Sequence, residues 1–413
     1  MSYKRSIKPD TTTRFYKKEA KKLLKQFRDR NQLALDLFDD FHPHKTTLKD
    51  AKLSDAQLVL ARHYNQKTWG HLLKVVESNQ QFKLLEKAFR AKDKKGIRQI
   101  LNKYDILFDR LLLRTAVLYG SLEMVEFLYS LGARDLQDAL GQAIYGCSKD
   151  IVDFLVSKGG NMAGNDRYGL IGSSSCELQN LNSLKFTLSY RSKPVPDYVF
   201  YEYFKILLGT YVRNPEGKHA CIEELINQGL TVEDTPMMAF HRGRIDLLEK
   251  AYKKDPGFIH QQFSLDEIFP KPFFKDNTNG LHLTPVEGST LLHLAMEYDE
   301  RAIMEWLIEK GADVNATSTI DHDGFGGHTP IFHTVVTFIP EDTSKAAFLL
   351  AHGANPNHRC SIRKQLKYTG KRHLEDMKEY KDVTPLSFAK QWLGGQNNSA
   401  ATLKILKKAG GIE

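Results

Sequence analysis

The chain of 413 residues exceeds the roughly 250–300 residues that one hydrophobic core usually serves, so we expect several domains or a repeat array. Hydrophobic residues make up 41% and charged residues 26%, which excludes an intrinsically disordered chain. The sequence has no apolar run of the roughly 18–20 residues that a membrane span needs, no signal-peptide core behind the charged start, and no CxxC pair among its four cysteines. These features predict a cytoplasmic protein.

The net charge of +9 is concentrated at the N-terminus. Residues 1–30 contain eleven Lys and Arg against three Asp and Glu, a net charge of +8, which leaves the other 383 residues at +1. A sequence-independent contact with nucleic acid would therefore have to use this segment.

The first predicted helix lies in this basic segment, in "RFYKKEAKKLLKQFRDR". Apolar residues recur on one helical face, at Tyr16, Ala20, Leu23 and Phe27. The pattern favours the first helix of the fold with a solvated lysine face over a helix that lies on a membrane surface.

Residues 54–77, "SDAQLVLARHYNQKTWGHLLKVVE", have the pattern of a helix-turn-helix. The second helix has an apolar stripe at Trp69, Leu72, Leu73 and Val76. Its exposed face keeps Gly70, His71 and Lys74, which are few for a helix that reads base edges. We therefore expect a helical cap on the first repeat, with DNA binding as the alternative.

The rest of the chain reads as a series of short helix pairs. The clearest is "GSTLLHLAMEYDERAIMEWLIEKGADVNA", residues 288–316, with Thr290 placed to cap the first helix and Gly311 to close the second. Each helix is too short to be stable alone, so the pairs must stack. Related pairs are predicted, in chain order, at 82–105, 111–133, 138–160, 171–192, 198–230, 235–260, 327–357 and 382–411.

The 288–316 segment closely resembles the ankyrin-repeat consensus GxTPLHxAAxxGxxxxVxxLLxxGADVN. Over nearly its whole length the chain is also similar to an uncharacterised bacterial set of ankyrin-repeat proteins, through stretches such as "DAQLVLAR", "FSLDEIFP" and "DHDGFGGHTP". The resemblance implies an all-α ankyrin-repeat solenoid of stacked antiparallel helix pairs with hairpin fingers. The expected parts are a helical N-terminal cap region (1–80), divergent repeats (81–262), an irregular packed insertion (263–287) and C-terminal repeats with two enlarged fingers (288–413).

The enlarged fingers follow from the repeat spacing. In the consensus, the glycine of GxTP follows the asparagine of GADVN by six residues, whereas Asn315 to Gly327 is twelve and Asn357 to Asp382 is twenty-five. The two insertions therefore add six and nineteen residues. Fingers of adjacent repeats lie side by side, so the insertions should be neighbours on one rim. Thr329 and Pro330 are expected as the N-cap and first residue of the next helix.

Several groups of residues are candidates for a metal, anion-binding or catalytic site. The fingers carry potential metal ligands at Asp321, His322, Asp323, His328, His333, His358, Cys360 and His373, but their spacing fits no tight zinc motif. "GFGG" before a helix resembles an anion-binding loop but lacks a preceding strand and GK[ST].

His293 stands at the TPLH histidine, which implies structural hydrogen bonds between loops, and no nucleophile elbow is present. Cys176 is expected in the core and Cys147 near a turn. We therefore expect no enzyme activity, cofactor or metal.

The leading functional hypothesis is a non-catalytic, monomeric scaffold that binds another protein through its concave face and the enlarged fingers. The expected contact residues include one exposed aromatic side chain; they are Asp321, Asp323, Phe325, His328, Arg359, Arg363, Lys364 and Lys367. The alternative is nucleic-acid binding through the basic segment and residues 54–77. Two further alternatives are a metal-dependent activity at the fingers and a role as a secreted bacterial effector.

Overall fold

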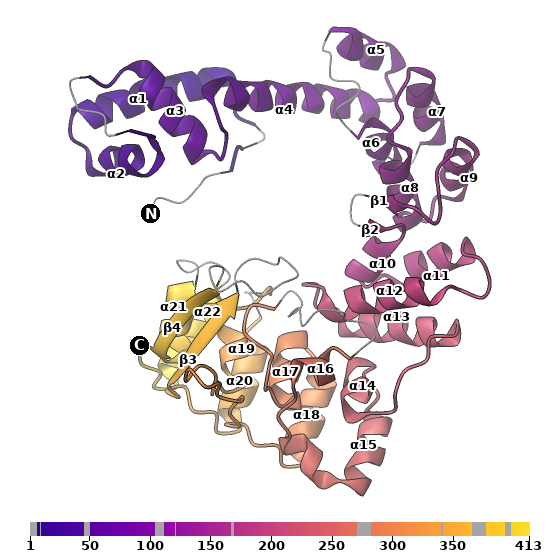
Figure 1. Ribbon diagram of the computed structural model, residues 1–413, viewed down its shortest axis with the longest axis vertical. Coiled ribbons are helices and arrows are strands. Elements are labelled where there is room, and N and C mark those ends of the chain that lie inside the picture. Colours follow the sequence, from indigo (N-terminus) through magenta and orange to yellow (C-terminus); the bar gives the residue numbers. More distant parts are fainter. Residues whose placement is uncertain are drawn as a thin grey trace. The chain divides into compact units, whose positions relative to one another are not determined.

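A computed structural model describes residues 6–8, 10–44, 50–103, 111–119, 121–166, 169–270, 282–339, 342–365, 377–392 and 398–413 (Figure 1). The chain divides into two compact units, 1–142 and 143–413, which we call unit 1 and unit 2. The described residues form mainly short helices, with two small antiparallel sheets in unit 2.

Unit 1 begins with a helical bundle that has its own core. Its helices are α1 (Thr13–Arg28), α2 (Gln32–Phe41), α3 (Leu53–His63) and α4 (Trp69–Arg90). The apolar face of α1 predicted from the sequence is buried in this core together with Phe38, Val59, Leu60 and Leu72. The side chain of Thr12 caps α1 by accepting a hydrogen bond from the Phe15 amide at 3.3 Å.

Helix α4 differs from the sequence prediction because it is continuous over 22 residues. The sequence had suggested that one helix ends near residue 77 and that a separate pair begins at residue 82. No glycine or proline interrupts residues 71–90, and Leu85, Ala88 and Phe89 continue the buried face. The remaining helices of unit 1 are α5 (Lys94–Lys103), α6 (Leu112–Leu118), α7 (Leu122–Ser130) and the start of α8 (Leu136–Tyr145).

The first part of unit 2 contains the more divergent helix pairs. The predicted segments at 171–192, 198–230 and 235–260 each contain two helices. Cys176 is fully buried, and Cys147 adopts a left-handed conformation (φ 52°) at an exposed turn, as expected from the sequence. The elements are α9 (Lys149–Ser157), β1 (Asn165–Asp166), β2 (Gly169–Leu170), α10 (Ser173–Glu177), α11 (Leu181–Ser189), α12 (Asp197–Gly209), α13 (Pro215–Asn227), α14 (Pro236–His241) and α15 (Ile245–Lys254).

The described parts of the irregular insertion before the best repeat, 263–270 and 282–287, are packed against the core. The insertion contains the short helix α16 (Leu265–Ile268), and the 3-10 helix η1 (Pro256–His260) precedes it at the end of the predicted 235–260 segment. Phe263, Ile268 and Phe269 are buried, and the backbone of Phe263 pairs with Ser289 at the start of the next repeat. Residues 271–281 of this predicted segment lie outside the described residues.

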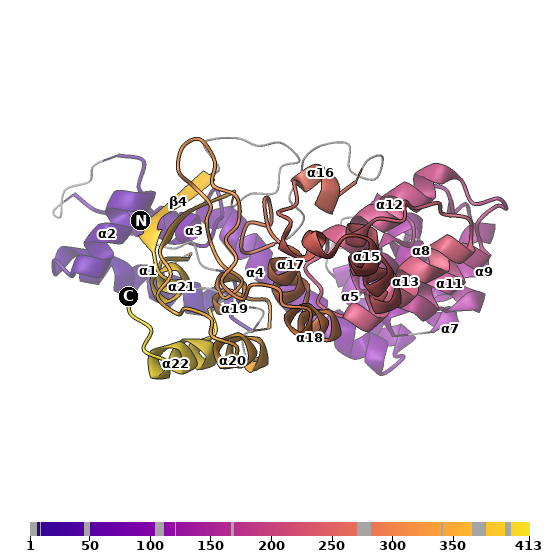
Figure 2. The same ribbon diagram turned by 90° about the horizontal axis from the view of Figure 1, so that it is seen from below.

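The C-terminal repeats form two rows of helices (Figure 2). The first helices of the pairs are α17 (Leu291–Tyr298), α19 (Phe332–Val335) and α21 (Pro385–Gln391), and the second helices are α18 (Arg301–Glu309), α20 (Ser344–Ala351) and α22 (Ala400–Lys408). An asparagine at the same position links each repeat to the next. Asn315 Oδ1 accepts from the Asn355 amide at 2.7 Å, and Asn357 Oδ1 accepts from the Ile412 amide at 2.7 Å. The repeated contact sets the stacking of neighbouring pairs.

The start of α19 corrects one prediction. The helix begins at Phe332 with Ile331 as its N-cap, not at Pro330 after Thr329. Pro330 and Ile331 instead form a turn in which the Phe332 amide donates to the Thr329 carbonyl at 3.0 Å. The helix is only four residues long because the chain is already extended at Val336, which pairs with Asn398.

Candidate functional site

The first enlarged finger, residues 318–328, is closed by hydrogen bonds at its base and its tip. At the base, the Ser318 amide donates to the His328 carbonyl at 2.9 Å. At the tip, the Asp321 amide donates to the Phe325 carbonyl at 2.8 Å. The Asp321 carboxylate in turn accepts from the amides of Asp323 (3.0 Å) and Phe325 (2.9 Å). The tip of the finger is therefore a loop in which the amides of Asp321, Asp323 and Phe325 are hydrogen-bonded within the loop.

The second enlarged finger is a β-hairpin made of β3 (Cys360–Gln365) and β4 (Met377–Val383). The strands are antiparallel, with Ile362 opposite Tyr380 and an irregularity between Cys360 and Ile362. Ile362 and Tyr380 are both 1% exposed, and the Tyr380 ring meets Phe388 of α21 edge to face with centroids 5.1 Å apart. One face of the hairpin is thus packed on the last repeat.

The two fingers are joined to each other, as their neighbouring positions in the repeat array predict. The Gly326 amide donates to the Ser361 carbonyl at 2.7 Å, so the first finger pairs with β3 on the edge opposite β4. Gly326 has φ 122°, a conformation that side-chain-bearing residues rarely adopt. We call residues 318–328 together with β3 and β4 the finger platform.

Arg363 is the central charged residue of the finger platform. Its guanidinium donates to Asp321 Oδ2 at 2.6 Å and to Asp323 Oδ2 at 2.9 Å, and it lies 4.7 Å from the centroid of the Phe325 ring. Burial acts to raise the pKa of Asp321, but the Phe325 amide and the charge of Arg363 outweigh it and hold this pKa below its usual value. The carboxylate is therefore ionised at neutral pH and the contact is a charge-assisted one.

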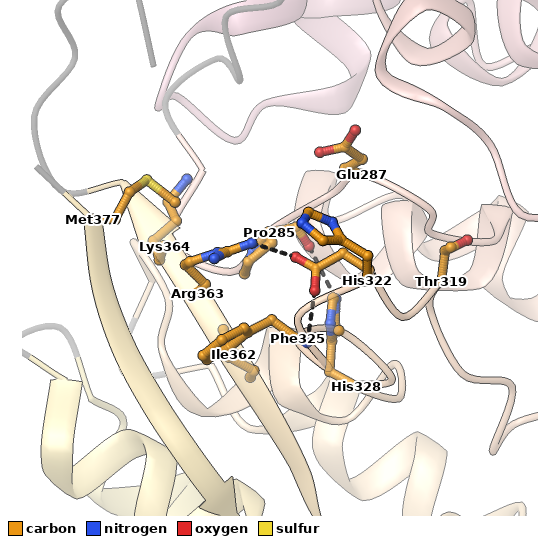
Figure 3. A pocket seen from close by; sticks show the side chains of 12 residues that line it. Pro285, Glu287, Thr319, His322, Phe325, His328, Ile362, Arg363, Lys364 and Met377 are labelled. Atoms are coloured by element: carbon orange, nitrogen blue, oxygen red, sulfur yellow. Dashed lines mark hydrogen bonds and ion pairs between the residues drawn. The ribbon is translucent and has the colours of Figure 1, made fainter. Parts of the chain in front are cut away.

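A pocket of about 280 Å³ opens between the two fingers and the loop that precedes α17 (Figure 3). Its walls carry both signs of charge beside apolar side chains. The lining residues are Pro285, Glu287, Thr319, Asp321, His322, Phe325, Gly326, His328, Ile362, Arg363, Lys364 and Met377. Pro285, Glu287, Thr319, Ile362 and Met377 were not expected from the sequence. For Pro285 and Glu287 the reason is that nothing local marks the loop before α17 as a neighbour of the fingers.

The structure brings together Asp321, Asp323, Arg363 and Lys364 from the predicted contact set, all on the finger platform. The expectation of an exposed aromatic at Phe325 is wrong, because this ring is only 9% exposed and lies beneath Arg363. Lys367 lies outside the described residues.

Two further members of the predicted contact set have structural partners. His328 is 1% exposed, and its ring nitrogens are hydrogen-bonded to Ser318 Oγ (2.8 Å) and to the Pro285 carbonyl (3.0 Å). Arg359 pairs with Asp382 through two contacts of 2.9 and 2.7 Å at the base of the hairpin. His328 therefore supports the first finger from within the fold, whereas the exposed Arg359 holds the base of the hairpin at the surface.

Several of the potential metal ligands that the structure describes have structural partners instead. Among the described residues, no group of three or more His, Cys, Asp or Glu side chains has the arrangement to hold a metal ion. His333 contacts Glu297 at 2.8 Å, whereas His358 contacts the Gly327 carbonyl at 2.8 Å. His373 lies outside the described residues. The Gly326 amide of the "GFGG" loop is already used by Ser361, so this donor is not available to an anion.

His293 has the structural role that the TPLH tetrapeptide implied. Its Nδ1 is 2.8 Å from Thr290 Oγ1, and its Nε2 is 2.9 Å from the His328 carbonyl of the next repeat. The side chain is fully buried, which lowers its pKa to about 3. His293 is therefore a neutral link between two loops.

A buried charge cluster between α13, α17 and α19 was not expected from the sequence. Glu297 accepts from Arg213 at 2.9 Å and from His333 at 2.8 Å. Glu300, which lies between α17 and α18, is paired with Lys218 and contacts His219 at 3.0 Å. Arg213 and Glu297 are 84 residues apart, so no local pattern could have indicated the pair.

The helix-turn-helix predicted at 54–77 corresponds to α3 and the first part of α4. Leu72 and Val76 are fully buried, and Gly70, His71 and Lys74 are exposed, as the sequence indicated. The exposed start of α4 thus offers few groups that could reach base edges.

Comparison with known proteins identifies one of the repeats. Residues 287–319, which hold α17, α18 and the start of the first finger, match the family model of the ankyrin repeat. The solved structure of the human ASB11 ankyrin repeat domain is similar at 15% sequence identity and a TM-score of 0.28, over 66% of this chain and 98% of that one. No curated protein sequence matches.

The stacked helix pairs and the match over 287–319 make the fold an all-α ankyrin-repeat solenoid, which confirms the predicted fold class. Ankyrin repeats generally mediate protein–protein interactions and are typically non-catalytic. Within the described ranges, no helix combines the length and apolar character of a membrane-spanning segment.

Proposed function

We propose that unit 2 is a non-catalytic scaffold that binds another protein through the finger platform and the adjoining concave face of the repeats. The observation that carries the proposal is the contact of Arg363 with both Asp321 and Asp323. It joins two insertions that the stacking of ankyrin repeats does not require.

The ordering of the platform supports a binding role. A loop that must become ordered on binding loses affinity through the entropy of that ordering, whereas a preformed one does not. The first finger is held by its own hydrogen bonds, by Gly326 pairing with Ser361, and by Arg363. The platform therefore presents a preformed surface.

The surface chemistry suits a polar protein partner. His322 is largely exposed, and Lys378, Glu379 and Lys381 of β4 are exposed as well. The pocket beside them has the size to receive one or two side chains, with Met377 and Ile362 as apolar contacts. A partner that inserts a side chain here would make its strongest contact in the pocket, surrounded by polar ones.

The test is affinity capture with the full-length wild type and with a variant in which both fingers are shortened to the ordinary repeat length. Circular dichroism and thermal unfolding establish that the variant keeps its helices. A partner that is captured by the wild type and lost by the variant supports the proposal. Partners that all survive the shortening refute it.

A further inference from the structure

We propose that α1 of unit 1 is a contact surface for the phosphate backbone of double-stranded nucleic acid, through one continuous face of lysine and arginine. The face, which we call the cationic face, consists of Arg14, Lys17, Lys18, Lys21, Lys22 and Lys25. This proposal concerns unit 1 and is independent of the protein-binding role of unit 2.

Helical geometry places these residues together. At about 100° per residue, they fall within an arc of about 140°, and every residue of α1 on that arc is Lys or Arg. The buried residues Tyr16, Ala20, Leu23 and Phe27 fall on the opposite side. Glu19, which is the only acid of α1, lies outside the arc. The six side chains therefore share one solvent-facing surface.

The six cations of the cationic face are accessible to a ligand. All six are exposed, and none forms an ion pair with another residue that the structure describes. By contrast, two other cations of unit 1 are paired, Lys94 with Glu123 at 2.6 Å and Lys83 with Asp10. A row of unpaired like charges destabilises the helix that carries it, by a few tenths of a kcal/mol for each close pair. A polyanion would relieve this repulsion.

The net charge of unit 1 as a whole also favours the binding of a polyanion. Residues 1–142 contain 28 Lys and Arg against 17 Asp and Glu, a net charge of +11, whereas residues 143–413 have 31 against 33, a net charge of −2. The positive potential that attracts a polyanion belongs to unit 1 alone.

Two features of α1 favour nucleic acid over other anionic partners. A membrane-surface helix inserts its apolar face into lipid, but that face of α1 is occupied by the core of unit 1. Protein interfaces are depleted in lysine, and the cationic face contains five lysines and no aromatic residue. Contacts made mainly by Lys and Arg are typical of phosphate binding.

The dimensions fit a duplex. Arg14 and Lys25 are separated by about 17 Å along the helix axis, a length over which a duplex carries about ten phosphates. Since the start of α4 offers few base-reading groups, we expect no sequence preference.

The test is a titration of the full-length protein with a DNA duplex of about 20 base pairs and with the matching RNA duplex, between about 50 and 200 mM salt. If four of the six cations contact phosphates, the slope of log K against log salt for the DNA duplex is about −3.6, and binding weakens by about 150-fold over this range. The two duplexes distinguish DNA from RNA as the source of the phosphates. Vesicles with and without anionic lipid test the membrane surface in parallel.

The variant that tests the face carries Lys17→Gln, Lys18→Gln, Lys21→Gln and Lys25→Gln. Its matched control removes the same charge from exposed lysines of unit 2, by Lys253→Gln, Lys254→Gln, Lys404→Gln and Lys408→Gln. We expect the first variant to lose at least about tenfold in affinity and most of the salt dependence, and the control to bind as the wild type. A Lys→Arg version of the first variant should keep the affinity, which separates loss of charge from loss of folding.

The proposal is overturned if the wild type shows no salt-sensitive binding to either duplex. It is equally overturned if both glutamine variants lose affinity alike, since the effect would then follow net charge. Binding to anionic vesicles without binding to duplexes would assign the face to lipid instead.

Discussion

Arg363 of β3 and Asp321 of the first finger lie 42 residues apart in the chain and meet at 2.6 Å. The contact joins two insertions that belong to different repeats, and Asp321 at the same time fixes the amides of Asp323 and Phe325. One carboxylate therefore organises the tip of one finger and connects it to the other.

Arg363→Ala should loosen the first finger with little effect on global stability. The ion pairs of Arg363 are partly exposed, so the free energy of unfolding should fall by no more than about 1 kcal/mol. Hydrogen exchange at the amides of Asp323 and Phe325 should accelerate, because Asp321 is no longer held in place. In the control Arg359→Ala, whose partner is Asp382, exchange at these two amides should stay unchanged.

Gly326→Ala and Gly324→Ala form a matched pair in the same loop. A Cβ at Gly326 would collide with the carbonyl of Thr319 at a φ of 122°, whereas a Cβ at Gly324 (φ 84°) meets nothing within 4 Å. We expect a loss of about 1 kcal/mol for Gly324→Ala and about 3 kcal/mol or more for Gly326→Ala, measured by urea unfolding. Equal losses would show that the loop does not adopt this conformation.

Glu297→Ala should be among the most destabilising substitutions. The carboxylate is 4% exposed and its partner Arg213 is 3% exposed, so its removal leaves a buried charge without its counterion. The expected loss is about 3–5 kcal/mol in the free energy of unfolding. The control Glu305→Ala removes an exposed carboxylate from α18 and should change stability by less than about 0.5 kcal/mol.

Unit 2 should lose stability on mild acidification, because it buries neutral histidines. Burial lowers the pKa of His282 to about 4 and those of His241 and His293 to about 3, and it holds the pKa of His328 well below its usual value. The unfolded chain takes up these protons below about pH 6.5 while the folded chain does not. Stability is thus full above pH 6.5 and falls as the pH drops toward the folded pKa values.

The expected loss between pH 6.5 and 5.5 is about 1 kcal/mol for each histidine, or about 4 kcal/mol for the four. Urea unfolding followed by the fluorescence of the buried Trp306 and Trp392 measures it. His282→Gln should reduce the number of protons taken up on unfolding by about one, and with it the pH dependence of the free energy of unfolding. The exposed His322→Gln should leave both unchanged. A stability that is constant over this range contradicts the neutral, buried state of these residues.

The sequence predicted the repeats well because their signals are local. Helical periodicity located the pairs, and the GxTPLH and GADVN positions gave the insertion lengths from which the neighbouring fingers followed. His293 could be assigned to a link between loops because its role depends on its place in the repeat, and the structure places it there.

What the sequence did not predict depends on contacts between distant residues. Phe325 looked exposed because a polar loop surrounds it, and only the approach of Arg363 from the next finger covers the ring. The pair of Arg213 and Glu297 spans two repeats. The early end of α19 reflects the pairing of Val336 with Asn398, 62 residues further along the chain.

The central claim, that the finger platform binds a protein partner, is tested most directly by titrating a captured partner against two charge-matched variants. Glu287→Lys reverses a charge on the wall of the pocket, and Glu305→Lys makes the same change on the exposed side of α18. The account predicts that Glu287→Lys shifts Kd by at least about tenfold, in a direction set by the charge of the partner, and that Glu305→Lys leaves it within about twofold. A Kd that Glu287→Lys leaves unchanged, or that both variants shift alike, would contradict it.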